Sequence, residues 1–340
     1  MDLTNEQWEV LELLIPNSLR QKAEKTGGTG VRTFKVAIWV ALLTAVLITG
    51  CNQGRQEGQG TGSTKNSSEA LERQAQQATT SEEEKAQREA PFTATPRMKG
   101  GLEGAADSIQ EVRFGKHEGY ERAVIDFGSE GAPASRGPVW SLSSPPAEGY
   151  VRITFPEIGA TSETDGIFGG SILDNFYVVR APGGGMFVDV FATGAFRYRV
   201  IELSNPGRLI LDYHPTSVGL SFPIPARAKK TVLIEPRQGE AITSPLRVSG
   251  YSRNFEASNT ITLRASGGDV LSQRTVLSND WSETWGYFEA SLEFPAFEGP
   301  ATLRVGGVSP RDGSFEGVEV PLTYGGGSLP ATGGGQRPVR

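Results

Sequence analysis

From Ser108 onward the chain consists largely of short runs in which apolar and polar residues alternate, separated by segments with glycine, proline and asparagine. The clearest early runs are Arg122–Phe127, Tyr150–Phe155, Phe196–Val200 and Arg208–Tyr213. A period of two puts every second side chain on the same face of a β-strand, so these runs favour antiparallel strands with one buried face. The 43 glycines and 21 prolines among 340 residues also favour strands and turns over helices.

The spacing of such runs predicts a mostly β protein with two consecutive small β-sandwich domains, and the chain is long enough for both. We expect the first domain at residues 107–222, with further strands at Asn175–Arg180 and Met186–Ala192. The second domain, at residues 229–324, contains seven strand candidates: Thr231–Ile234, Leu246–Tyr251, Thr260–Ala265, Val270–Leu277, Tyr287–Phe294, Ala301–Val305 and Val318–Tyr324. Seven short strands between turn residues are typical of an immunoglobulin-like sandwich.

Two segments of the first domain resemble a known family. Val112–Phe127 is similar to the opening of the AMIN-like domain of exported bacterial proteins, and Pro206–Asp212 resembles its closing strand. The related AMIN domains of cell-wall amidases and secretins are non-catalytic and target their hosts to peptidoglycan. The resemblance, which covers residues 107–222, therefore implies binding in the cell envelope.

The second domain resembles the bacterial spore-germination immunoglobulin-like domain. The segments that carry this resemblance are Ile234–Pro236, Ser244–Gly250, Asn254–Ala257 and Ser309–Ser314. Such domains accompany germination lipoproteins and other envelope proteins, so the resemblance implies interaction or scaffolding without a reaction.

An uncharged apolar segment lies far upstream of both domains. Val36–Gly50 is shorter than the about 20 residues that a membrane-spanning helix needs, and Arg32 and Lys35 precede it. This length and these flanking charges are typical of a signal peptide, which we place at residues 31–50. The alternative is an uncleaved membrane anchor.

Cys51, the only cysteine of the chain, follows this segment directly. The run Leu47–Cys51 resembles the lipobox of bacterial lipoproteins, in which the cysteine sulfur receives a diacylglycerol and the preceding peptide is removed. The resemblance implies cleavage between Gly50 and Cys51 and lipidation of Cys51. We therefore expect acyl chains to hold the protein on the extracytoplasmic side of the cell membrane.

Three segments have no predicted globular fold. Residues 1–30 form an atypical extension, of which residues 1–16 resemble the opening of insertion-element transposases; we interpret it as a fusion relic or a mis-called start, with a short amphipathic helix as the alternative. Residues 51–106 are poor in aromatic residues and are predicted to be a disordered tether. Residues 325–340 form a glycine-rich tail that we expect to be disordered. Its run Leu329–Gly333 resembles the sortase recognition motif; we interpret this as a chance match, with a truncated relic of the motif as the alternative.

Few residues of this chain are suited to catalysis. His117 and His214 are its only histidines, neither lies in a His-Glu-x-x-His run, and the chain has no Gly-x-Ser-x-Gly elbow. We therefore expect no enzymatic activity, no metal site and no cofactor. A net charge of −6 with mixed signs predicts no nucleic-acid partner.

Alternation also places several cationic and aromatic side chains on the outer faces of the predicted sheets. The residues that we select as possible ligand-binding residues on this basis are Arg122, Tyr150, Arg152, Arg197 and Arg199. Tyrosine can stack on sugars, and arginine can bind carboxylates through paired hydrogen bonds. The alternative is an ordinary solvated sheet face, which would have the same pattern.

Together these features predict a membrane-anchored, non-catalytic binding or scaffold module of the cell envelope. Its expected partner is cell-wall peptidoglycan or another envelope protein. The alternative function is an accessory factor or weak hydrolase in cell-wall remodelling, which would release muropeptides from purified peptidoglycan.

Overall fold

A computed structural model of the protein describes residues 84–143, 148–221 and 223–325. These residues form two consecutive β-sandwiches, as predicted. Within this part of the chain, α-helix is found at residues 84–89. Among the described residues, no helix has the length and hydropathy needed to cross a membrane. The predicted N-terminal extension, the signal peptide, Cys51 and the sortase-like motif lie outside the described residues.

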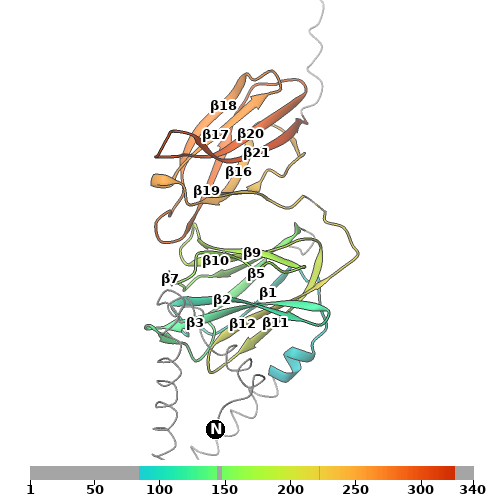
Figure 1. The fold of residues 1–340 in the computed structure, drawn as a ribbon, viewed down its shortest axis with the longest axis vertical. Helices are drawn as coiled ribbons and strands as arrows, with labels where there is room; N and C mark the ends of the chain where they lie inside the picture. Colours follow the sequence, from blue (N-terminus) through green and yellow to red (C-terminus); the bar gives the residue numbers. More distant parts are fainter. Residues whose placement is uncertain (1–83, 144–147, 222, 326–340) are drawn as a thin grey trace, which may run out of the picture. The chain divides into compact units, whose positions relative to one another are not determined.

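The first sandwich has one sheet with five strands in a row (Figure 1). In spatial order the strands are β11 (Phe196–Leu203), β12 (Arg208–Pro215), β3 (Tyr120–Ser129), β2 (Ser108–His117) and β7 (Ala160–Thr161), and β4 (Ala132–Pro133) pairs with β3. All neighbours are antiparallel except β2 and β7. Turn residues between two consecutive runs allow a short loop, and strands joined by a short loop pair antiparallel.

The facing layer of this sandwich is also antiparallel. In spatial order its strands are β1 (Arg97–Gly100), β5 (Trp140–Ser143), β6 (Tyr150–Phe155), β10 (Met186–Ala192) and β9 (Leu173–Arg180), and β8 (Asp165–Ile167) pairs with β9. The two layers bury a shared core, in which the rings of Phe127 and Phe155 meet edge to face at 5.3 Å.

The second sandwich has the two-layer arrangement of an immunoglobulin-like domain. One layer contains β19 (Trp285–Leu292), β16 (Leu246–Ser252), β14 (Thr231–Glu235) and β13 (Ala226–Ala228). The other contains β15 (Ala241–Ile242), β21 (Phe315–Tyr324), β20 (Pro300–Val308), β17 (Ser258–Ala265) and β18 (Val270–Leu277). A 3-10 turn, η2 (Phe255–Ala257), leads from β16 to β17, and the core between the layers includes Val248, Leu263 and Phe288.

The two sandwiches are joined by a sheet contact and by a buried apolar layer. Strands β9 and β19 pair in parallel at Val179 with Trp285 and at Arg180 with Gly286, which extends one sheet across both sandwiches. The outer faces of β6, β9 and β10 pack against the outer faces of β14, β16 and β19. We call this the junction layer; its residues are Tyr150, Tyr177, Val179, Ala181, Phe187, Phe191, Val232, Ile234, Tyr251 and Trp285.

A buried ion pair lies in the junction layer. Arg152 of β6 and Asp189 of β10 are cross-strand partners, and both nitrogens of the guanidinium edge donate to the carboxylate at 2.8 Å. The Asp189 side chain is completely buried, and Arg152 stacks over the ring of Phe187 at 4.0 Å. Burial opposes the charge of Arg152, but the charge and hydrogen bonds of Asp189 outweigh burial and raise the pKa of Arg152.

The strands predicted from alternation are confirmed, and three of them coincide with β6, β10 and β18 at both ends. The predicted tether at residues 51–106 is wrong from residue 84 onward. Residues 84–89 are helical, Thr93 bridges to Tyr198, and β1 pairs with β5. These contacts order a polar segment that has too few apolar residues to be recognised as structured by itself.

Removing one partner of the buried ion pair should destabilise the protein strongly. In Asp189→Leu the Arg152 charge stays buried without its partner, which costs about 3–5 kcal/mol. The double variant Asp189→Leu/Arg152→Met removes both charges and should recover most of this loss, because apolar replacement of a complete pair is often neutral. Urea unfolding of the three proteins tests this; a double variant as unstable as Asp189→Leu would contradict it.

Candidate functional site

The candidate site lies on the outer face of the β11–β12–β3 sheet of the first sandwich. Arg199, Asp212 and Arg122 occupy directly opposite positions on the three strands, so they form one cross-strand row. Their side chains share a face because strands in register place paired residues on the same side of a sheet. The inward neighbours Phe196 and Tyr198 are buried, as alternation predicts.

One carboxylate holds two guanidinium groups in this row. Arg122 donates to Asp212 at 2.6 and 2.9 Å, and Arg199 donates to Oδ2 of the same residue at 2.6 and 3.2 Å. The Asp212 side chain is completely buried. The hydrogen bonds to Asp212 raise the pKa of Arg122, although burial opposes the charge. The row therefore carries more positive than negative charge.

Aromatic rings surround the arginine row. Phe92 lies 4.8 Å from the Arg199 guanidinium and packs against Tyr120 and His214, with ring centroids 5.9 and 5.2 Å away. His117 stacks on Tyr120 at 4.6 Å with nearly parallel planes. The rings of Phe92 and Tyr120 therefore pack on the guanidinium groups, and the Arg122 and Arg199 side chains are only 16% and 13% exposed.

Arg197 is the exposed cation of this face. It lies two residues before Arg199 on β11, so both side chains point to the same side of the sheet, and it is opposite the exposed His214. Within the described residues Arg197 makes no hydrogen bond or ion pair. Two of the three arginines at this end of the sheet share one carboxylate, and the third has none. We call this surface the arginine face; its residues are Arg122, Arg197, Arg199 and Asp212 with Phe92, His117, Tyr120 and His214.

Residues 84–93 run along the edge strand β11 beside the arginine face; their helical part is cyan in Figure 1. Arg199 donates to the backbone carbonyls of Arg88 and Ala90. Side chains of this segment accept hydrogen bonds from the backbone N–H groups of Glu202 and Ser204, at 2.7 and 3.1 Å. The segment thereby covers the open edge of the sheet, which would otherwise expose unpaired backbone groups.

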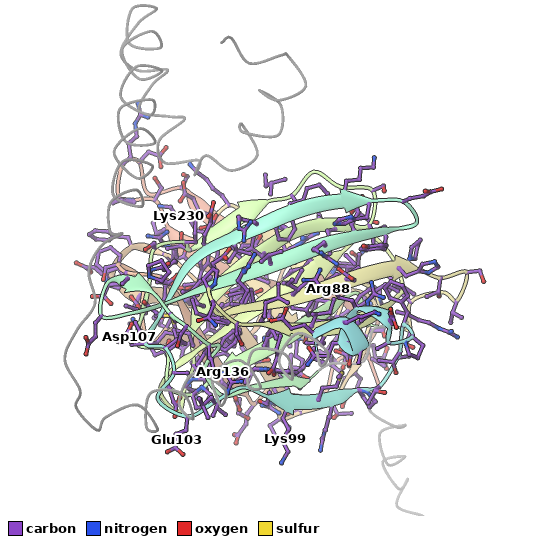
Figure 2. All side chains as sticks on the ribbon, turned by 90° about the horizontal axis from the view of Figure 1, so that it is seen from below. Arg88, Lys99, Glu103, Asp107, Arg136 and Lys230 are labelled. Carbon is purple, nitrogen blue, oxygen red and sulfur yellow. The ribbon has the colours of Figure 1, made fainter. Side chains whose placement is uncertain are left out.

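A shallow cavity of about 140 Å³ lies between this segment and the first sandwich. Arg88, on the helical segment, and Arg136, at the rim of the cavity, are labelled in Figure 2. The carboxylate of Glu202 lines the cavity, but it already accepts the indole N–H of Trp140 at 2.6 Å and the backbone N–H of Gly101 at 2.9 Å. Its polar group is therefore occupied by structural contacts.

The structure brings together three of the five residues selected from the sequence. Arg122, Arg197 and Arg199 lie on the arginine face. The expectation that Tyr150 and Arg152 face solvent is wrong. Tyr150 is only 4% exposed and the Arg152 side chain 21%, because the second sandwich packs against this face of the sheet. Arg152 is also paired with Asp189 of the neighbouring strand.

Sequence reasoning missed the residues that organise the arginine face. Asp212 is a single acidic residue within the otherwise apolar run Leu209–Tyr213, and its burial marks it as an ion-pair partner. Phe92 lies in a segment predicted to be disordered. Tyr120 lies in Val112–Phe127, the segment that resembles the AMIN-like domain, and it is not among the residues selected as possible ligand-binding residues.

Glu121 is a buried carboxylate of the first sandwich with a structural role. It accepts the backbone N–H groups of Ser171, Ile172 and Leu173 and the Ser171 hydroxyl, all within 2.9 Å. Burial raises its pKa, but these hydrogen bonds outweigh it and leave the pKa below the ordinary value. Within the described part of the chain, no cluster of histidine, cysteine and acidic residues is arranged to hold a metal ion.

Comparison with known families identifies the second sandwich. Residues 231–314 match the family described as the immunoglobulin-like domain of bacterial spore germination. The predicted resemblance of this domain is thereby confirmed. No curated protein and no solved structure matches the chain.

The pKa of His117 should depend on Arg122. Burial and then the positive charge of Arg122 lower this pKa below 6.5, so the ring stays neutral somewhat below that pH and the unfolded chain protonates first as pH falls. Arg122→Gln removes the positive charge and should raise the pKa. NMR titration resolves this readily because the chain has two histidines.

The matched control for this titration is Arg311→Gln, which removes an exposed arginine from the second sandwich. It should leave the His117 titration unchanged. An unchanged pKa of His117 in Arg122→Gln would show that the two side chains do not interact in solution.

Proposed function

We propose that the protein is a lipid-anchored, extracytoplasmic binding module without catalytic activity, and that its arginine face holds the cell-wall polymer peptidoglycan. The observation that carries this proposal is the excess of guanidinium groups over carboxylates on that face. Arg122 and Arg199 are held by Asp212, whereas Arg197 is exposed beside them.

The chemistry of peptidoglycan fits such a face. Its peptide stems present free carboxylates, and arginine binds carboxylates with paired, charge-assisted hydrogen bonds. Arg122 and Arg199 keep a fixed orientation through Asp212, so they add positive potential without a further loss of side-chain freedom. Arg197 supplies donors that have no partner within the described residues.

Two features of the chain support the envelope location. The run that ends in Cys51 resembles a lipobox, and the second sandwich is an immunoglobulin-like domain of the spore-germination class. The AMIN-like resemblance of residues 107–222 stays a prediction, and it points to the same compartment. A scaffold for another envelope protein would use the same anchor, and the arginine face favours an anionic polymer instead.

Sedimentation with purified cell wall tests the proposal. The full-length protein should sediment with peptidoglycan without releasing muropeptides, and less so as salt is raised, because the contact is ionic. Arg197→Gln should weaken binding about threefold to tenfold, corresponding to about 1 kcal/mol for an exposed charged contact.

Arg311→Gln is again the matched control, since it removes one exposed positive charge away from the first sandwich. It should sediment like the unchanged protein. Failure of the unchanged protein to sediment, or equal binding by Arg197→Gln, would overturn the proposed role of the arginine face.

A further inference from the structure

We propose that Phe255 and Trp281, on the second sandwich, form a stacking site for a sugar ring. The inference rests on the proposed function, since it assigns the glycan strand of peptidoglycan to a second site. The two side chains are 46% and 38% exposed. Their rings meet edge to face with centroids 5.6 Å apart.

The backbone that presents Phe255 is strained. In η2, Glu256 and Ala257 have φ values of 53° and 58°, a left-handed conformation that residues with a Cβ rarely adopt. Two such residues in succession are energetically unfavourable, and such strain persists only where surrounding contacts impose it. This turn directly follows the exposed Phe255 and fixes the backbone beside it.

A buried polar network below the turn imposes this conformation. The Asn254 side chain donates to Thr231 at 3.0 Å and to Asn259 at 2.8 Å. Asn259 and Ser278 donate in turn to the carbonyl of Ala257, at 2.9 and 3.2 Å. All these side chains are buried, so the turn is tied to the interior of the sandwich.

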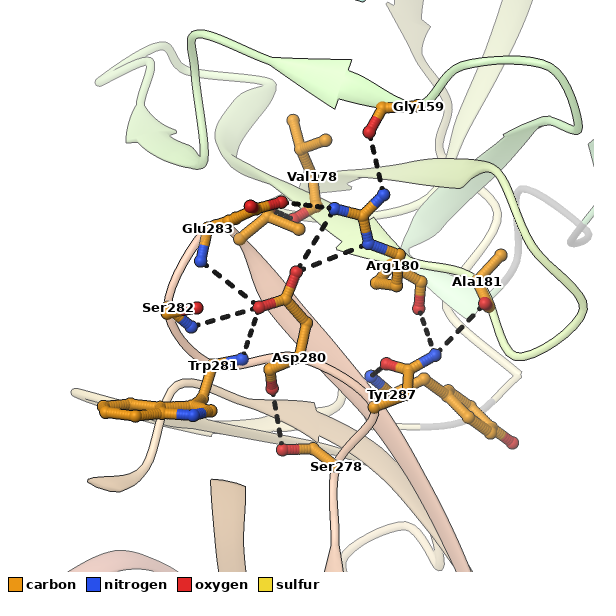
Figure 3. Close-up of polar contacts among 12 residues, drawn as sticks. Gly159, Val178, Arg180, Ala181, Ser278, Asp280, Trp281, Ser282, Glu283 and Tyr287 are labelled. Atoms are coloured by element: carbon orange, nitrogen blue, oxygen red, sulfur yellow. Dashed lines mark hydrogen bonds and ion pairs between the residues drawn. The ribbon is translucent and has the colours of Figure 1, made fainter. Parts of the chain in front are cut away.

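Trp281 is presented by a second rigid turn. The Asp280 carboxylate accepts the backbone N–H groups of Trp281, Ser282 and Glu283, at 2.6, 3.1 and 3.2 Å. Figure 3 shows Arg180, from the first sandwich, reaching the other Asp280 oxygen at 3.3 Å and Glu283 at 3.0 Å. Contact between the sandwiches therefore fixes the loop that carries the indole ring.

The size of this apolar surface favours a small ring over a protein. An aromatic side chain offers about 150–250 Å² when fully exposed, so the two exposed fractions amount to roughly 200 Å². A protein partner needs about 800 Å² on each side. One face of a pyranose ring is of the size of an aromatic side chain, and apolar C–H groups of a sugar pack on such rings.

Polar groups beside the rings match the hydroxyl and amide groups of a sugar. The Glu283 side chain is 77% exposed and can accept hydrogen bonds. The indole N–H of Trp281 has no acceptor among the described residues, so it is available to a ligand. Both turns are fixed before binding, which lowers the entropic cost of holding a ligand.

Titration calorimetry of the full-length protein with a tetramer of N-acetylglucosamine tests this site. The unchanged protein should bind this probe, and Trp281→Ala and Phe255→Ala should each weaken binding at least tenfold. The matched control is Phe114→Ala, which removes a 36% exposed aromatic ring from the first sandwich and should bind unchanged. Thermal unfolding of each variant shows that the fold is intact.

Absence of binding by the unchanged protein, or equal binding by Trp281→Ala, would overturn the inference. The outcome is separable from that of the proposed function. Sedimentation with cell wall without binding of the oligosaccharide would support the arginine face and overturn the site at Phe255 and Trp281. Binding of the oligosaccharide through Trp281 without sedimentation would support the site at Phe255 and Trp281 and overturn the proposed role of the arginine face.

Discussion

The buried layer between the two sandwiches is the contact on which the rest of the structure depends. Aromatic rings from both domains fill it, and Tyr177 touches both Tyr251 and Trp285. The Arg152–Asp189 pair is enclosed in the same layer. Burial of these apolar rings makes separation of the domains costly, because separation would expose them to water.

This junction determines which surfaces remain for ligands. It removes the outer face of β6, β9 and β10 from solvent and leaves Arg197, on the outer face of β11, exposed. On the second sandwich it supplies Arg180, which fixes the turn around Trp281. The same contact therefore closes one candidate surface and orders another.

The sequence was sufficient for most strands and insufficient for what covers them. Strict alternation located β6 and indicated correctly that Tyr150 and Arg152 share a face, but alternation does not reveal a neighbouring domain. The signal lay in β10, whose residues Met186–Ala192 are apolar on both faces apart from Asp189 and are all buried. A strand with two apolar faces needs two covers. β1 escaped prediction because its four residues have no apolar run and depend on pairing with β5.

The two proposed sites together suit a repeating polymer. Each site offers few contacts: exposed guanidinium chemistry at Arg197, and the rings of Phe255 and Trp281. Each is therefore expected to bind weakly by itself. When both engage one strand, the second contact is intramolecular, and combined affinity exceeds either one without new interactions. This gain in affinity requires a fixed separation between the sites. With a loose linkage, the entropy lost in ordering the two domains on binding would offset the gain. The junction layer orders the two domains before a ligand binds. The packing of Arg152 and Asp189 in this layer therefore contributes to recognition at surfaces that neither residue touches.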